Sequence, residues 1–216
     1  MKAKSAVIAL ACVALLGVLK ADDVLYSQGP IDSNYSFASQ NDTSGGNGSF
    51  ATEYDNFTLG GDATVTGVSW RGLFFNPYEH GTITGFTLSF WADSGNAPGG
   101  LLASTFIPGI AGETLVSGTM YDYSATVADF AASAGTQYWL SIVPDLGFPP
   151  QWGWTVGGGG DSLSYQKFFG TLTPNQSDMT FTLTGKTASV PDSGVTLLYS
   201  GLAMAALALV RRRLAG

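Results

Sequence analysis

Three stretches of the chain alternate between apolar residues and threonine or serine, as half-buried β-strands do. They are residues 63–70, 82–90 and 179–184. Each stretch places its apolar side chains on one face of the strand and its hydroxyl side chains on the other. Shorter apolar runs bounded by glycine and proline predict further strands at residues 55–59, 101–107, 114–127, 137–143, 151–156 and 163–169.

This succession of strands predicts one all-β domain over residues 22–186, a length that allows a sizeable core. Only residues 127–134 offer a helical alternative, and they could equally form a loop. Eight or more short strands without crossover helices predict an antiparallel β-sandwich of jelly-roll type. Residues 34–49, rich in Ser, Asn, Gly and Asp, are expected to form a flexible loop or a lead-in to a strand that becomes ordered on contact.

An apolar segment precedes this domain. Lys2 and Lys4 come before apolar residues 6–19, and Ala21 follows, which predicts a secretory signal peptide over residues 1–21. The protein is therefore expected to be exported through the inner membrane.

A second apolar segment, residues 195–210, carries no charge and predicts a transmembrane helix. At about 1.5 Å per residue it reaches about 24 Å, short of the roughly 30 Å hydrocarbon core, so it would span only marginally. Arg211, Arg212 and Arg213 open a basic tail over residues 211–216, which is expected to be cytoplasmic and to act as a stop. The domain would then lie on the outer side of that membrane.

A tether at residues 187–194 joins the domain to this helix and ends in a short motif, Val190, Pro191, Asp192, Ser193 and Gly194. Motif, apolar helix and arginine cluster together resemble the PEP-CTERM sorting signal of Gram-negative bacteria, in its VPDSG variant, over residues 190–213. The resemblance implies that an exosortase-type enzyme removes the helix from a transiently membrane-anchored precursor. The mature protein would then be released or attached at the cell surface. An ordinary single-pass anchor is the alternative.

Residues 86–102, 135–142 and 152–154 are also similar to the body of many PEP-CTERM proteins. This second resemblance implies a surface β-sandwich and supplies no reaction.

The domain is strongly acidic. Residues 22–190 contain fifteen acidic residues but only three basic ones, Arg71, Lys167 and Lys186, which gives a net charge of -12. Such a domain repels phosphate backbones, so no nucleic acid is expected as a partner.

The residues that most catalytic sites need are scarce. The one cysteine, Cys12, lies in the signal segment, and the one histidine is His80. A Cys/His pair and a multi-histidine zinc site therefore cannot form. Paired carboxylates for glycoside hydrolysis remain possible, but no spacing selects a pair. The chain is thus predicted not to be an enzyme and to need no cofactor, with structural calcium possible where Asp93 and Asn96 offer oxygens in a loop.

Aromatic residues suggest a binding function instead. Trp70, Trp91 and Trp139 are expected mainly in the core. Trp152 and Trp154 point to one side of their strand, and Gly153 between them leaves room for a ligand, so they fit a core role and a sugar-stacking role equally. Two hypotheses therefore stand. One is a noncatalytic surface or extracellular-matrix protein associated with exopolysaccharide or biofilm, and the other is a carbohydrate-binding module that uses exposed aromatics.

Overall fold

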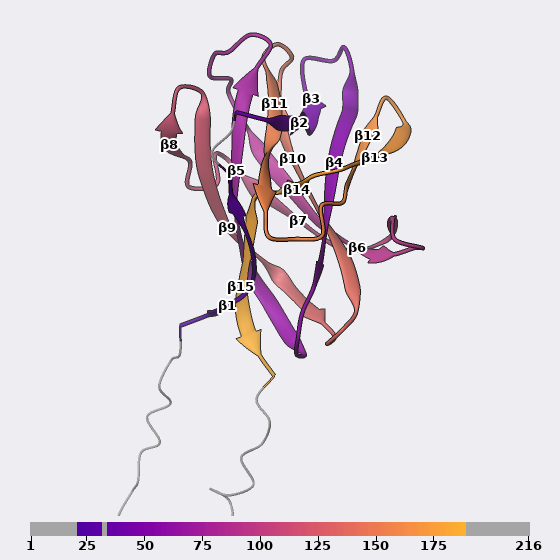
Figure 1. Ribbon diagram of the computed structural model, residues 1–216. Helices are drawn as coiled ribbons and strands as arrows, with labels where there is room; N and C mark the ends of the chain where they lie inside the picture. Colours follow the sequence, from indigo (N-terminus) through magenta and orange to yellow (C-terminus); the bar gives the residue numbers. More distant parts are fainter. Residues whose placement is uncertain (1–20, 32–33, 189–216) are drawn as a thin grey trace, which may run out of the picture.

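The computed structural model describes residues 21–31 and 34–188, and this part of the chain is all-β, with strands in two sheets (Figure 1). The eight-stranded sheet has the order β14-β11-β1-β15-β5-β9-β8, with β2 paired to β11. Its strands are β1 (Asp23–Pro30), β2 (Ser36–Ala38), β5 (Ala63–Phe75), β8 (Thr114–Ser117), β9 (Met120–Ala132), β11 (Gln151–Gly158), β14 (Asp178–Met179) and β15 (Phe181–Thr187).

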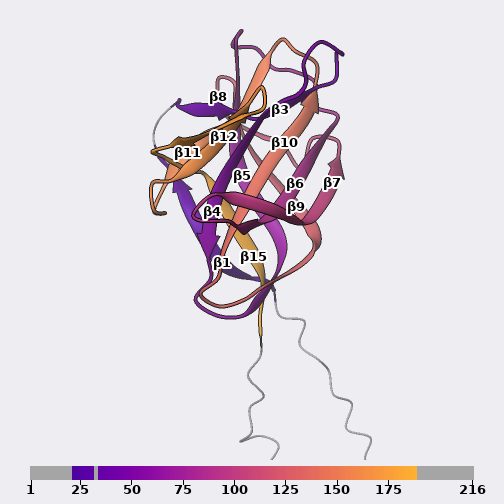
Figure 2. The same cartoon turned by 90° about the vertical axis from the view of Figure 1, so that its right-hand side faces the viewer.

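The seven-stranded sheet has the order β13-β12-β4-β3-β10-β6-β7 and faces the viewer in Figure 2. Its strands are β3 (Gln40–Asp42), β4 (Gly48–Thr58), β6 (Gly85–Asp93), β7 (Pro98–Pro108), β10 (Gln137–Leu146), β12 (Ser164–Phe168) and β13 (Thr171–Asn175). The arrangement is consistent with the predicted β-sandwich. The expectation of purely antiparallel pairing is wrong at one place, because the short strand β3 pairs in parallel with β10.

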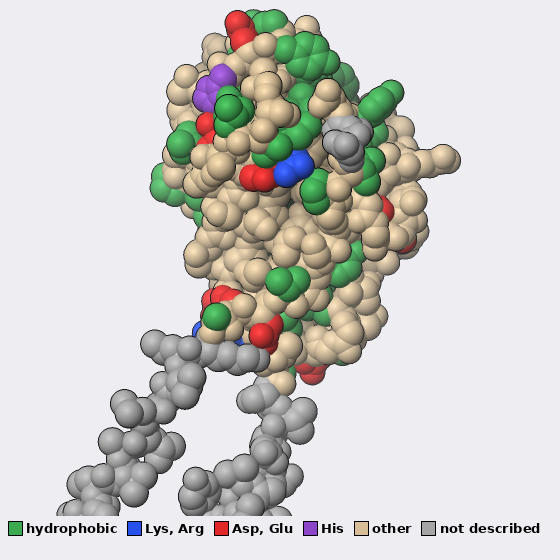
Figure 3. Space-filling view, turned by 60° about the vertical axis from the view of Figure 1, so that its left-hand side comes forward, with side chains coloured by type: hydrophobic (Ala, Val, Ile, Leu, Met, Phe, Trp, Pro, Cys, Tyr) green, Lys and Arg blue, Asp and Glu red, His purple; other side chains and the backbone are tan. Residues whose placement is uncertain are grey.

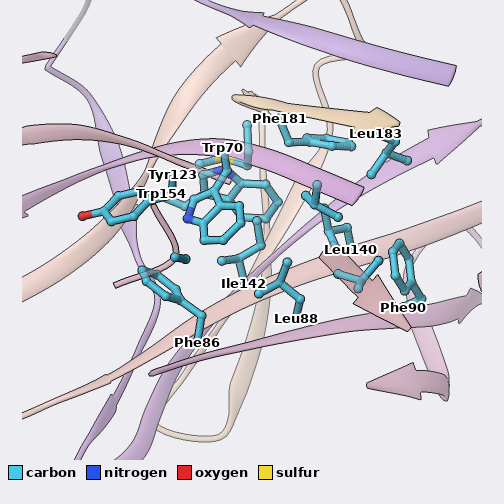
Figure 4. Close-up of a cluster of buried hydrophobic side chains, with 14 of the residues drawn as sticks. Trp70, Phe86, Leu88, Phe90, Tyr123, Leu140, Ile142, Trp154, Phe181 and Leu183 are labelled. Atoms are coloured by element: carbon cyan, nitrogen blue, oxygen red, sulfur yellow. The ribbon is translucent and has the colours of Figure 1, made fainter. Parts of the chain in front are cut away.

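The core lies between the two sheets and is rich in aromatic side chains (Figure 4). In β6 the alternate residues Phe86, Leu88 and Phe90 are buried and point toward Trp70 and Phe181 of the other sheet. Trp70 and Phe86 meet edge to face, with ring centroids 5.0 Å apart. Burying each such side chain stabilises the fold by roughly 1.5–3 kcal/mol, so this layer joins the two sheets.

The first and last described strands run side by side. β1 pairs antiparallel with β15, and Asp23 lies opposite Gly185. The two ends of the described domain therefore emerge at the same end of the molecule (Figure 1).

The strand expected at residues 63–70 is confirmed within β5, and residues 82–90 contain a strand that begins only at Gly85. Residues 114–127 form two strands, β8 and β9, since the chain turns at Gly118, where φ is +54°.

The helical alternative for residues 127–134 is wrong, because β9 continues as a strand to Ala132. An irregularity in the pairing of β9 with β5 separates the buried residues Val127 and Phe130 by three positions. Three is also a helical spacing, so the bulge imitates a helix in the sequence.

Residues 34–49, expected to form a flexible loop or a lead-in to a strand, contain β2, β3 and the start of β4, with a turn at residues 43–47. Ser39 and Gln40 are fully buried, and Gln40 accepts a hydrogen bond from the backbone N–H of Trp152 at 2.8 Å. Asp42 accepts bonds from the backbone N–H groups of Ser44 and Asn47, both at 2.9 Å, and so closes the turn to β4. The polar side chains of Ser39, Gln40 and Asp42 therefore serve buried hydrogen bonds, whereas residues 43–49 are exposed.

Several predicted segments lie outside the described residues. They are the signal segment before Ala21, the sorting motif Val190 to Gly194, the helix at residues 195–210 and the tail with Arg211, Arg212 and Arg213. Within residues 21–31 and 34–188 the structure contains no apolar helix of membrane-spanning length.

Candidate functional site

The structure corrects the sequence-based choice of tryptophans. Trp152 and Trp154 are both 0% exposed. The indole N–H of Trp154 donates to the carbonyl oxygen of Thr180 at 2.7 Å. The ring of Trp152 lies so close over Gly72 of β5 that a Cβ there would come within 2.0 Å of it. Neither ring offers a face to a ligand, so both are core residues.

The room expected beside Gly153 is occupied too. A Cβ on Gly153 would lie within 3 Å of the Ser36 hydroxyl and of the Phe75 ring. β11 is thus covered on both faces. The sequence of a single strand does not show whether other elements cover its second face.

The weak calcium candidates Asp93 and Asn96 have other partners. Oδ1 of Asp93 accepts hydrogen bonds from the indole N–H of Trp139 at 2.9 Å and from the Gln137 amide at 3.0 Å. The Gln137 amide also donates to the side-chain oxygen of Asn96 at 2.8 Å. These bonds fix the β6–β7 turn against β10. Residues 21–31 and 34–188 contain no cluster of three or more His, Cys, Asp or Glu side chains suited to a metal ion.

A groove of about 560 Å³ crosses the outer face of the seven-stranded sheet, the face turned away from the core. Side chains of β6 form its floor. Because successive side chains of a strand point to opposite faces, Thr87, Ser89 and Trp91 point outward while the residues between them enter the core. The other strands of this sheet add Ser49, Thr52 and Tyr54 of β4, Ser141, Val143 and Asp145 of β10, Leu101 and Ser104 of β7, Lys167 of β12 and Asn41 of β3.

Trp91 is the partly exposed tryptophan of this groove. Its indole N–H donates to the Ser141 hydroxyl at 2.9 Å. Its ring meets that of Tyr54 edge to face, with centroids 5.5 Å apart and planes at 74°. Two contacts, from β10 and β4, thus hold the indole in one orientation.

A second tryptophan, Trp139, lies beside Trp91 on the outer face of the seven-stranded sheet and is buried. Trp139 lies directly opposite Trp91 in the β6–β10 pairing and is 0% exposed. The Tyr165 ring of β12 packs edge to face against Trp139 with centroids 5.4 Å apart. Trp139 is therefore buried as expected, although it lies on the outer side of the sheet and not between the sheets.

The remaining lining is mostly hydroxyl. Ser89 and Ser104 share a hydrogen bond of 2.9 Å, and Thr52 and Thr87 are partly exposed. At one end the side-chain amide of Asn41 donates to Asp145 at 2.9 Å. These groups can donate and accept hydrogen bonds along the groove.

A second hollow of about 350 Å³ continues the groove past Trp91. It shares Tyr54, Trp91 and Lys167 with the first hollow and adds Pro98, Gly99, Gly170 and Leu172. The tip of the β6–β7 hairpin projects from the sheet beside it (Figures 1 and 2). Trp91 therefore lies where two hollows meet, as in a site for an extended ligand.

Two buried carboxylates lie under this face and do not open into it. Glu53 and Asp55 of β4 are both 0% exposed. Burial raises the pKa of Glu53 well above its usual range, although a hydrogen bond from the Asn175 amide acts in the opposite direction. Burial likewise raises the pKa of Asp55, which accepts the backbone N–H of Met179. Both groups are shielded from any ligand in the groove.

The eight-stranded sheet carries a different hollow, of about 340 Å³. There Arg71 forms a two-bond ion pair with Asp122, at 2.7 and 3.0 Å. Figure 3 views this side and shows a basic and an acidic side chain together above a broad area with few apolar side chains. The aromatic side chains at this hollow, Trp70, Tyr123 and Phe181, are buried, so no ring is open for stacking there.

His80 of the β5–β6 loop contacts the eight-stranded sheet. It forms a 2.9 Å bond with Glu113, which also accepts from the Tyr123 hydroxyl at 3.0 Å. Its ring packs against those of Phe74 and Tyr121, with centroids 4.8 and 5.0 Å away. The histidine ties the β5–β6 loop to the eight-stranded sheet.

One signal in the sequence could have identified Trp91. It continues the outward series Thr87 and Ser89, whereas Phe86, Leu88 and Phe90 form the inward series. A tryptophan on the polar face of an alternating strand is exposed unless another element covers it. Alternation alone could not separate Trp91 from Trp139, because Tyr165, which covers the latter, comes from a strand far along the chain.

No protein-family model matches the chain, and no curated protein sequence matches it.

Proposed function

We propose that this protein is a noncatalytic carbohydrate-binding protein of the cell surface or extracellular matrix, and that the groove around Trp91 holds a polysaccharide. One observation carries the proposal: a partly exposed indole, held by Ser141 and Tyr54, lies in a groove lined by hydroxyl groups. A sugar ring has an apolar face of C–H groups and a rim of hydroxyls. The indole matches the face, and the serine and threonine side chains match the rim.

The shape of the groove supports a polymeric ligand. The two hollows share Tyr54, Trp91 and Lys167, and the first extends to Asp145 while the second extends to Leu172. A polymer can therefore enter at one end and leave at the other. The exposed side chains Leu101 and Leu172 add apolar surface along its path.

The distribution of carboxylates supports binding without catalysis. Glycoside hydrolysis commonly needs two carboxyl groups that flank the scissile bond. Among the described residues that line the two hollows, Asp145 is the sole carboxylate, and Asn41 already donates to it. Glu53 and Asp55 are buried beneath the sheet.

Export, sorting and the finer topology belong to the same proposal. The two-sheet domain is of jelly-roll type, and it reaches the surface through the signal segment and the VPDSG-type sorting signal, with an exosortase-type enzyme as processing partner. Support comes from the resemblance of residues 190–213 and from β1 and β15, which bring both ends of the domain to one end of the molecule. An anchor attached there would leave the groove accessible on the side of the sheet.

Retention on immobilised polysaccharides tests the binding proposal. The full chain, kept in a detergent without a sugar headgroup, is passed over a panel of neutral and acidic bacterial and plant polysaccharides. We expect retention on at least one of them and a loss of about tenfold or more in affinity for Trp91→Ala, because the stacking surface is removed. Tyr78→Ala is the matched control, since Tyr78 is 74% exposed and lies in the β5–β6 loop outside the groove. No retention on any polymer, or equal loss in both variants, would refute the proposal.

A further inference from the structure

Lys167 occupies a central position in the groove. It lies in β12 directly opposite Thr52 of β4, on the outer face of the sheet, and its side chain is exposed. It lines both hollows, as Trp91 and Tyr54 do. A ligand stacked on Trp91 therefore passes next to an ammonium group.

This ammonium group has no counter-ion in the described part of the chain. Arg71, Lys167 and Lys186 are the cations of an otherwise acidic domain. Arg71 is paired with Asp122. Lys186 lies at the end of β15, opposite Thr64 and far from the groove lining. Lys167 forms no ion pair with any residue that the structure describes, although the domain has many carboxylates.

The rest of the groove limits how much negative charge a ligand can carry. Asp145 lies at the other end of the first hollow, and the net charge of the domain is -12. A polymer with a carboxylate on every sugar would place like charges close to Asp145 and near an acidic surface, which is unfavourable. A polymer with a carboxylate on only some sugars avoids this repulsion.

We infer that the groove binds a polysaccharide in which acidic sugars are separated by neutral ones, with Lys167 pairing the carboxylate of one unit while Trp91 stacks on a neighbouring neutral ring. The inference rests on the proposed function and names its ligand class. A neutral polymer would leave the ammonium group without a partner, and a fully charged polymer would meet repulsion.

The probe is gellan, in which glucuronate is separated by neutral sugars, and its matched control is the same polymer after chemical reduction of the carboxyl groups. Affinity of the full chain is measured in detergent without a sugar headgroup. We expect gellan to bind roughly fivefold or more tightly than carboxyl-reduced gellan at low salt, and the difference to shrink as salt is added. Polygalacturonate, with a carboxylate on every unit, is expected to bind more weakly than gellan.

The variant Lys167→Gln is expected to abolish the difference between gellan and its reduced form. Lys186→Gln makes the same change of charge outside the groove and is expected to preserve the difference. Both lysines are exposed, so neither variant should disturb folding.

The outcomes separate this inference from the proposed function. Equal binding of native and reduced gellan, or an unchanged difference in Lys167→Gln, would overturn the acidic-ligand inference while leaving a neutral-glycan site intact. Stronger binding of polygalacturonate than of gellan would overturn the inference that neutral sugars separate the acidic ones. No binding of any polymer, or binding insensitive to Trp91→Ala, would instead refute the proposed function itself.

Discussion

At the scale of single residues, the two kinds of tryptophan differ in what covers them. Trp152 packs against Gly72 and the Tyr123 ring, with no exposed surface. Trp91 keeps part of its ring in solvent above Ser141. The burial expected for Trp70 and Trp139 is confirmed. Trp91 is partly exposed instead of core, and Trp152 and Trp154 are buried instead of open to a ligand, because the covering atoms belong to other strands.

Stability should separate these two tryptophans. Trp152→Ala leaves a large cavity in the core and is expected to lower the free energy of unfolding by about 3–5 kcal/mol. Trp91→Ala removes a partly exposed ring and one hydrogen bond and should cost about 1 kcal/mol. Urea unfolding followed by circular dichroism measures both. Equal costs would contradict the assignment of Trp152 to the core and Trp91 to the surface.

At the scale of strands, regular alternation of apolar and polar residues predicted the strand positions well where burial of the apolar side chains stabilises the strand. β5 and β15 show this, since their buried side chains alternate with serine and threonine. β2, β3 and β14 were harder to predict, because they are short and partly polar. Asp178 of β14 is 5% exposed and accepts the backbone N–H groups of Gly160 and Ser162. Such strands depend on tertiary hydrogen bonds, which no local pattern encodes.

The buried carboxyl group of Glu53 in β4 should make the stability of the fold depend on pH. Burial holds the pKa of Glu53 well above its unfolded value of about 4.3, so the ionised form disfavours folding. The free energy of unfolding is therefore largest below that unfolded value and decreases as pH rises toward the raised pKa. Hydrogen bonds from Ser44 and others hold the pKa of Asp42 below its usual range, and its contribution is constant above about pH 5.

Glu53→Gln removes this ionisation and should make the fall in melting temperature between pH 5 and 8 shallower. The difference in melting temperature between Glu53→Gln and the unmodified protein should therefore shift in favour of the variant as pH rises. Glu79→Gln, the same change on an exposed loop residue, should leave the slope unchanged. Melting curves by circular dichroism across this range test the expectation, and parallel slopes for all three proteins would contradict it.

At the scale of the whole molecule, the all-β class and most strand positions follow from the sequence, whereas the position of the groove does not. Which strands share a sheet depends on pairings such as β4 with β10 and β10 with β6, between residues far apart in the chain. The groove exists because three such strands bring Tyr54, Ser141 and Trp91 together. Composition suggested a binding role for aromatic side chains, whereas the groove proposed for that role depends on the order of the strands in the sheet.

Processing is also a property of the whole chain. The sorting proposal predicts that the protein isolated from its native host has lost both apolar ends, near Ala21 and within Val190 to Gly194. Intact-mass spectrometry measures this directly. Mature molecules that retain Leu197 through Arg213 would show an ordinary anchor instead.

Hydroxyl-radical footprinting of the full chain with and without a retained polysaccharide tests the central claim most directly. Trp91, Leu101 and Leu172 line the groove, whereas Tyr78 and Leu115, 74% and 60% exposed, do not line it. The account predicts that the polysaccharide lowers the oxidation of the first three side chains and leaves the last two unchanged. Protection of Tyr78 or Leu115 with undiminished oxidation of Trp91 would contradict it.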